Sequence, residues 1–141
     1  MKRTLFAIAL LVAATFVTAG ASAQDHRVKA TVPFDFTVNG SAAPAGTYVI
    51  SAPMGQNVLN ISSWETKAHF LTAGVSNWDN REKDNVLVFH KVGNQYYLSA
   101  IRCHDSSMNV YFPPSKAEEK AKTQTLQAGI PISTDVMIAL E

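Results

Sequence analysis

The sequence predicts a mainly β protein, a small antiparallel β-sandwich or barrel of about seven or eight strands with one surface helix before the last strand. Apolar and polar residues alternate without a break from Val28 to Val38. Short β-branched and aromatic runs then recur between turns rich in Gly, Pro and Asn. A single helical pattern follows, close to the C-terminus. Together these features are typical of one β domain with a single core.

The first 23 residues have the pattern of a secretory signal peptide. Lys2 and Arg3 precede an uncharged run over residues 5–17, and small residues at 21–23 fit a cleavage site. The apolar run is shorter than the roughly 20 residues of a membrane-spanning helix. We therefore expect cleavage after Ala23, a mature domain over residues 24–141 with no membrane span, and a periplasmic or extracellular location.

Charge and cysteine content narrow the possible partners. The chain has 12 Lys and Arg against 11 Asp and Glu, and two of the basic residues leave with the signal peptide. Nucleic-acid binding needs a clustered basic excess, so we expect no nucleic-acid partner. Cys103 is the single cysteine, which excludes an intramolecular disulfide. We expect its thiol to be a buried strand side chain, with an intermolecular bridge as the alternative.

The N-terminal half predicts four strands. Over residues 28–38 the even-numbered side chains should face the core and the odd-numbered ones water, because successive strand residues point to opposite faces. Pro33 cannot donate to a strand ladder, so this strand should lie at an edge or carry a bulge. A turn-rich connection starts at Asn39 and Gly40. The further strands are expected at residues 47–51, 57–62 and 67–75, followed by a polar loop at 77–85.

The C-terminal half predicts a tight hairpin, a helix and closing strands. Residues 86–92 and 96–103 flank a short Gly-containing turn. Both faces of this hairpin carry large apolar residues, so we expect it to be central and covered by a sandwich or barrel. Ser115 and Glu118 form a capping box for a helix over 116–126, which has little to bury and should lie on the surface. Its apolar residues are Ala117, Ala121 and Leu126. Strands are expected at 108–112 and 135–140.

Four segments resemble a family of small exported acidobacterial β proteins. They are VPFDFTVNG at 32–40, PAGTYVIS at 44–51, VLVFHKVGNQYYLSAI at 86–101 and SKAEEKA at 115–121. The resemblance spans most of the mature chain but does not extend through residues 102–112. The family is uncharacterised, so the resemblance implies an exported β domain and supplies no catalytic residues.

Two residue groups have the composition of a reactive site, and both are weak candidates. His90 and His104 could approach each other through the hairpin with Asp105 as an oxygen ligand, but the histidine spacing does not match a metal site. Cys103, His104 and Asp105 are the residue types of a nucleophile, a base and an orienting carboxylate. Because neighbouring strand residues point to opposite faces, consecutive positions cannot form a relay. We expect no catalytic residues, no metal and no cofactor.

Aromatic side chains are the better candidates for ligand contact, because their rings offer a stacking face and a polar tip. The candidates are Trp64, Trp78, Tyr96, Tyr97 and Tyr111, with Phe112 next to the last. We expect a non-enzymatic exported domain with a binding or structural role, whose partner is a protein or a small apolar or sugar ligand. A barrel that carries a small apolar ligand is the first alternative, and a metal-dependent or hydrolytic enzyme is the second.

Overall fold

A computed structural model describes residues 27–53, 55, 57–76, 83–104, 108–131 and 134–141. The predicted signal peptide at 1–23, the candidate Trp78 and Asp105 lie outside the described residues. Within the described part no helix is long and apolar enough to cross a membrane.

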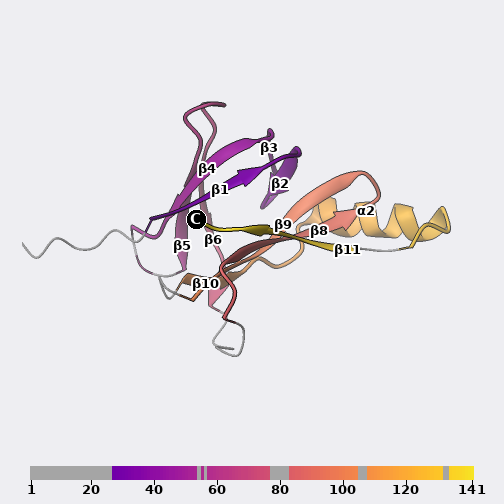
Figure 1. Cartoon of the computed structure of the whole chain (residues 1–141). Helices are drawn as coiled ribbons and strands as arrows, with labels where there is room; N and C mark the ends of the chain where they lie inside the picture. The colour runs from indigo at the N-terminus through magenta and orange to yellow at the C-terminus, as the bar shows by residue number, and fades with distance from the viewer. Residues whose placement is uncertain (1–26, 54, 56, 77–82, 105–107, 132–133) are drawn as a thin grey trace, which may run out of the picture.

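The chain folds as two β-sheets with one helix, which confirms the predicted fold class (Figure 1). Four strands form the first sheet, in the order β1 (Arg27–Val32), β4 (Gly46–Ser51), β5 (Val58–Ser62) and β6 (His69–Ala73). The second sheet contains β11 (Thr134–Ala139), β8 (Val86–Val92), β9 (Gln95–Cys103), β10 (Met108–Tyr111) and β7 (Val75–Ser76), with β2 (Phe36–Val38) and β3 (Ser41–Ala43) attached to β9. The helix α2 (Lys116–Gln127) precedes β11.

The edges of the two sheets are joined at two places, in addition to the crossing of the chain between β1 and β2, so the sheets curl into a half-barrel around one core. At one edge β6 continues through Gly74 into β7, and thus leaves the first sheet for the second. At the other edge the backbones of Lys29 and Glu141 exchange two hydrogen bonds, of 2.9 and 2.8 Å, which tie β1 to the chain end after β11. These two links hold the sheets face to face.

Gly74 is required at the first of these corners because there is no room for a side chain. A Cβ atom at this position would lie 2.1 Å from Cγ1 of Val110 and 2.9 Å from the carbonyl oxygen of Tyr111. Real Cβ atoms do not approach other atoms so closely, and one of the two obstacles is backbone. The predicted single strand at 67–75 is therefore divided, since the chain changes sheets at its glycine.

The predicted inward alternation near the N-terminus is confirmed, although the predicted strand is not continuous. Ala30, Val32, Phe36 and Val38 are each at most 5% exposed. Pro33 lies between β1 and β2, where the chain passes from the first sheet to the second and no ladder donor is needed. The prediction of one strand over 28–38 was thus wrong. The even-numbered side chains nevertheless face the core on both sides of Pro33.

The turn-rich connection predicted after Val38 contains a further short strand, β3. Asn39 and Gly40 have φ values of +46° and +86° and join β2 to β3 as a tight two-residue hairpin. Asn-Gly favours this turn because both positions need positive φ. One further pairing departs from an all-antiparallel arrangement, because Thr37 of β2 pairs with Tyr97 of β9 in parallel.

Aromatic rings fill the centre of the core. The ring of Phe36 meets Tyr48 and Phe89 edge to face, with centroids 5.1 and 5.2 Å apart. The Tyr48 hydroxyl donates to the carbonyl of Pro44 at 2.6 Å, so its polar tip is satisfied inside the protein. Burial by this core raises the pKa of Tyr48 above its ordinary value of 10.0. The Cys103 side chain, 2% exposed, belongs to the same cluster, as expected.

The cover of the central hairpin comes from α2 and not only from a second sheet. Val88, Val92, Tyr97 and Ala100 of β8 and β9 are buried but stand apart from the inter-sheet core cluster. The helix packs against β8 on this outer side (Figure 1). It does so through Glu118, Ala121, Lys122 and Thr125, the residues of its least exposed stripe. Ala117 and Leu126, two of its three apolar residues, are exposed, so the helix buries little apolar surface, as predicted.

Replacement of Gly74 by alanine should destabilise the whole domain. The added methyl group must displace Val110 or the backbone of Tyr111, and overpacking of this kind costs about 1–3 kcal/mol. We expect a loss at the upper end of that range in urea unfolding. Ala73→Ser, at an exposed neighbouring position, is the control and should change stability by less than about 0.5 kcal/mol. Equal unfolding midpoints for the two variants would contradict the crowded corner.

Candidate functional site

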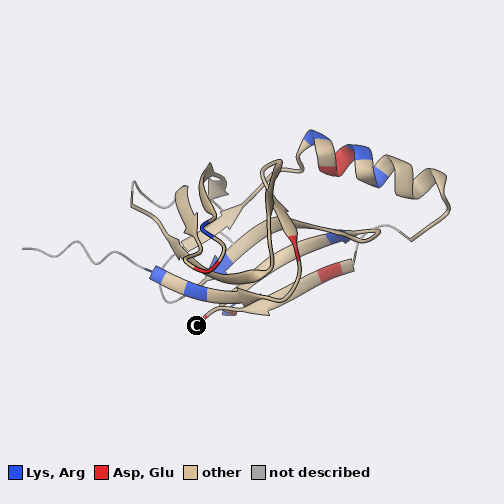
Figure 2. Cartoon of the chain, turned by 90° about the horizontal axis from the view of Figure 1, so that it is seen from above, with Lys and Arg blue, Asp and Glu red and all other residues tan. Residues whose placement is uncertain are grey.

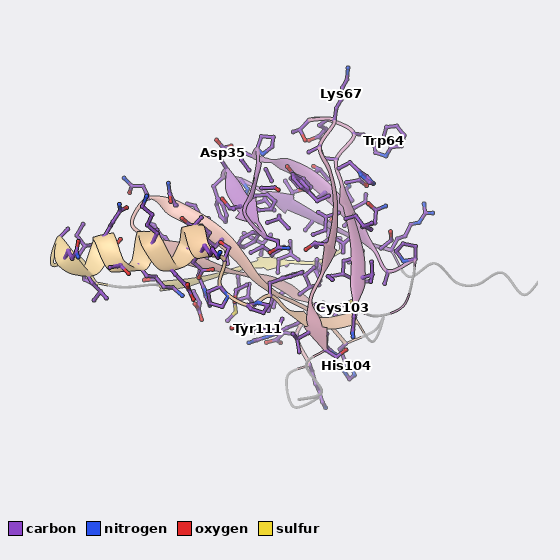
Figure 3. All side chains as sticks on the ribbon, turned by 180° about the vertical axis from the view of Figure 1, so that it is seen from behind. Asp35, Trp64, Lys67, Cys103, His104 and Tyr111 are labelled. Atoms are coloured by element: carbon purple, nitrogen blue, oxygen red, sulfur yellow. The ribbon has the colours of Figure 1, made fainter. Side chains whose placement is uncertain are left out.

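The predicted ligand-contact residues do not gather at one site. Trp64 is 91% exposed in the turn between β5 and β6, and Tyr111 is 39% exposed on β10. Figure 3 shows these two residues at distant ends of the molecule. Tyr97 and Phe112 are only 4% exposed, so neither is available to a ligand, contrary to the prediction. Tyr96 is half-buried.

Tyr96 is engaged by its own chain. Its ring stacks on Phe34 with centroids 3.9 Å apart and planes at 17°, and the Lys91 ammonium group lies 5.6 Å from its centroid. A surface hollow of about 370 Å³ lies beside it, with Asp35, Thr37, Pro44, Asn94 and Gln95 among its lining residues. Asp35 accepts a hydrogen bond from the Ala45 amide at 2.8 Å. Because the Tyr96 ring and the Asp35 carboxylate already have partners within the chain, this hollow is a weaker candidate than the Trp64 turn.

The turn that carries Trp64 is closed by its own hydrogen bonds. The Ser63 amide donates to the Ala68 carbonyl at 2.9 Å, the Thr66 amide to the Ser63 hydroxyl at 3.4 Å and the Ala68 amide to the Thr66 hydroxyl at 3.4 Å. Ser63 is itself 4% exposed. The backbone on both sides of the Trp64 indole is therefore fixed before any ligand arrives.

Contacts with β4 anchor the same turn to the first sheet. The Glu65 carboxylate accepts a hydrogen bond from the Thr47 amide at 3.0 Å. A Cβ atom on Gly46 would lie 3.1 Å from Cγ2 of Thr66, so the turn packs directly on the β4 backbone. Glu65 is thus held against the sheet while its neighbour Trp64 extends into solvent (Figure 3).

A surface hollow of about 340 Å³ lies beside the Trp64 ring. Its lining residues are Ser62, Ser63, Trp64, Lys67, Ala68 and His69. Lys67 has a φ of +56°, in the left-handed region that Gly and Asn occupy far more readily than Lys. Such a conformation costs roughly 1 kcal/mol or more for a residue with a Cβ atom. The hollow therefore combines one flat apolar surface with hydroxyl, imidazole and ammonium groups.

A second polar cluster lies beneath α2 and was not foreseen from the sequence. His90 of β8 shares a hydrogen bond of 2.8 Å between Nδ1 and Oε1 of Glu118, and one of 2.9 Å between Nε2 and the Ser99 hydroxyl. Lys122 pairs with the same Glu118 oxygen at 2.9 Å. Asp135 of β11, which is opposite His90 in the strand register, lies 3.7 Å from Nε2. Four elements thus meet at one imidazole.

A β-bulge directs Ser99 towards this imidazole. The register between β8 and β9 shifts between Val88 and Phe89, whose partners are Ala100 and Leu98, so Ser99 is left without an opposite residue. Bulges re-aim side chains in this way. Ser99 is 4% exposed and Glu118 is 4% exposed, so the chain of hydrogen bonds is closed off from solvent along most of its length.

The hydrogen bonds from Ser99 to His90 to Glu118 have the order of a serine, histidine and carboxylate catalytic relay. The burial of Ser99 and Glu118 instead indicates that the cluster anchors the helix. A nucleophile must meet its substrate, whereas Ser99 is shielded in the docked position of α2. The Glu118 carboxylate, a charged group at the most buried position of the helix, instead joins α2 to both strands of the central hairpin. The neighbouring Tyr97 is affected as well, because burial and the Glu118 charge raise its pKa above 10.0.

The sequence contained one signal for this anchor. Ser115 and Glu118 form the predicted cap, in which the Ser115 hydroxyl accepts from the Glu118 amide at 3.2 Å. The Glu118 side chain then bonds to His90, and not only to groups of its own helix. A helix without an apolar stripe must dock through polar groups, and this follows from its composition. Its partner on β8 depends on the tertiary fold.

The Cys103 and His104 side chains lie in different surroundings. Cys103 is in the core and His104 is exposed, as expected of neighbours on a strand, and Asp105 lies outside the described residues. Among the residues that the structure describes, no group of three or more His, Cys, Asp or Glu side chains is arranged to hold a metal ion.

Comparison of the chain with protein-family models, with curated proteins and with solved structures finds no match. The function must therefore be argued from the residues of this chain alone.

Replacement of Glu118 by alanine should loosen the helix. The change leaves His90 Nδ1 and Lys122 without their partner, and an unsatisfied buried polar group costs about 1–3 kcal/mol. We expect a loss of that size in urea unfolding, together with a lower helical signal in circular dichroism. Glu119→Ala is the matched control, because Glu119 is exposed in the same helical turn. Equal losses for the two variants would show that only the helix dipole matters, and not the anchor.

Proposed function

We propose that this protein is an exported, non-enzymatic binding domain that contacts a carbohydrate of the cell envelope or the surroundings through Trp64. One observation carries the proposal: an indole that is 91% exposed stands on a turn fixed by hydrogen bonds, beside a surface hollow. Scattered exposed apolar residues are normal on protein surfaces. A rigidly held, nearly fully exposed Trp next to a concave site is a more specific arrangement.

The chemistry of the hollow supports a sugar among the possible ligands. A pyranose ring has one apolar face that can stack on an indole and hydroxyl groups around its rim. Ser62 and His69 offer hydrogen-bonding groups for such a rim. Because the turn is already held by Ser63, Glu65 and Thr66, little conformational freedom is lost on binding.

The alternative of a carrier for a small apolar ligand has less support. The space between the two sheets is filled by Phe36, Tyr48, Phe89 and their buried neighbours. The two hollows described above lie at the surface and not within the core. Charges of both signs are interspersed over the strands and along α2, which favours a small contact over a broad electrostatic surface (Figure 2).

Co-sedimentation with insoluble polysaccharides tests the proposal. Trp64→Ala should weaken binding about tenfold, since loss of one stacking aromatic at a contact is worth on the order of 1.4 kcal/mol. Tyr111→Ala is the control, because it removes another partly exposed aromatic at a distant position and should leave binding unchanged. Retained binding by the Trp64 variant would disprove the contact.

Ser99, His90 and Glu118 support a second candidate, a serine hydrolase that opens by release of α2. A fluorophosphonate probe, which reacts with activated serine hydroxyls, distinguishes the two. We expect no labelling of the folded protein, because Ser99 is shielded. Labelling that disappears in Ser99→Ala, and in His90→Ala, would favour the hydrolase and overturn the non-enzymatic proposal.

A further inference from the structure

We infer that the Trp64 turn selects an acidic sugar, whose ring stacks on Trp64 while its carboxylate pairs with Lys67. The inference rests on the proposed function and names the ligand class of that same site. Two observations beyond the exposed indole support it: the backbone conformation of Lys67 and the charge balance of the hollow.

The first observation is that Lys67 has a backbone conformation that glycine adopts more readily than a residue with a Cβ atom. Lys67 has a φ of +56° and lies two residues before the start of β6, within the closed turn. On conformational grounds alone, Gly or Asn is favoured at this position. The chain instead places a long cationic side chain there, three residues from Trp64. Residues in strained conformations occur preferentially at ligand sites, and here the strained residue also lines the hollow.

The second observation is that the hollow carries one permanent charge, which is positive. Of its six lining residues, Lys67 is the one that carries an ammonium group, and none is acidic. The nearest carboxylate in the sequence, Glu65, is held by the Thr47 amide on β4 and does not line the hollow. Figure 3 shows Trp64 and Lys67 projecting from the same turn into solvent. An anionic group on the ligand would therefore meet an uncompensated cation.

The size of the hollow limits the ligand to a short segment. Small-molecule sites range from about 300 to 1,000 Å³, and this one is about 340 Å³. A uronic acid fits the requirements in one unit, because it combines a pyranose ring with a single carboxylate at its rim. Lysine serves as a point charge and needs no fixed bidentate geometry, which suits a carboxylate on a flexible ring substituent.

Fluorescence titration of Trp64 tests the inference. Trp78→Phe leaves Trp64 as the remaining tryptophan of the chain, since the sequence contains two. The ligands are oligogalacturonate and its methyl ester, which share every sugar ring and differ in the carboxylate charge. We expect the acid to bind at least fivefold more tightly than the ester at low salt. The preference should shrink as ionic strength rises, because an exposed ion pair is screened.

Variants at Lys67 identify the source of the preference. Lys67→Gln keeps the backbone strain and removes the charge, so the acid should bind no more tightly than the ester. Lys67→Gly removes both, so the preference should vanish while the domain becomes more stable. Lys83→Gln is the matched control, because it removes one exposed positive charge outside the hollow and should preserve the preference.

Each remaining outcome overturns the inference. Equal binding of acid and ester, or a preference that survives in Lys67→Gln, would exclude the role of Lys67 while Trp64-dependent polysaccharide binding upholds the proposed function. Absence of binding to both ligands would also overturn the acidic-sugar inference. The proposed sugar contact fails if Trp64→Ala leaves co-sedimentation with polysaccharides intact, a result that does not depend on the acid and ester comparison.

Discussion

The close approach of backbone and side chain at Gly74 is the constraint on which the fold depends. Strand 69–76 belongs to one sheet before this residue and to the other after it, so the two sheets share a continuous chain at that corner. The Val110 side chain occupies the space where a Cβ atom would stand. At the opposite edge, two backbone hydrogen bonds between Lys29 and Glu141 join β1 to the chain end after β11. The sheets are therefore held together by the corner at Gly74, by these terminal hydrogen bonds and by the crossing of the chain between β1 and β2.

The helix adds a different kind of contact to this framework. Its inward stripe consists of Glu118, Ala121, Lys122 and Thr125, so it offers little apolar surface to the sheet. What orients it is a buried carboxylate that bonds to His90, which in turn bonds to Ser99 on a bulge. Apolar packing tolerates sliding, whereas hydrogen bonds fix distance and direction. The hydrogen bonds of Glu118 therefore fix the position of α2 on the central hairpin more closely than the small apolar contact area of the helix would.

The same contrast separates the core from the Trp64 turn. Trp64 contributes nothing visible to the core, yet Ser63, Glu65 and Thr66 on either side of it are tied to the turn or to β4. The turn is thus ordered around a residue that is 91% exposed. Combined with the left-handed Lys67, this makes the end of the β5–β6 hairpin the part of the described surface best suited to a ligand.

The sequence by itself determined where most of the strands and the helix lie and which side their residues face, because alternation and capping are local properties. Ala30, Val32, Phe36 and Val38 are buried as their period of two requires, and α2 starts at its predicted cap. Only the tertiary structure decided that the chain breaks at Pro33 and Gly74 to change sheets, that Glu118 meets His90, and that Tyr97 is hidden while Trp64 is exposed. These outcomes depend on which distant segments pair. A local pattern fixes the two faces of a strand, but the neighbour on each face is set by the path of the whole chain.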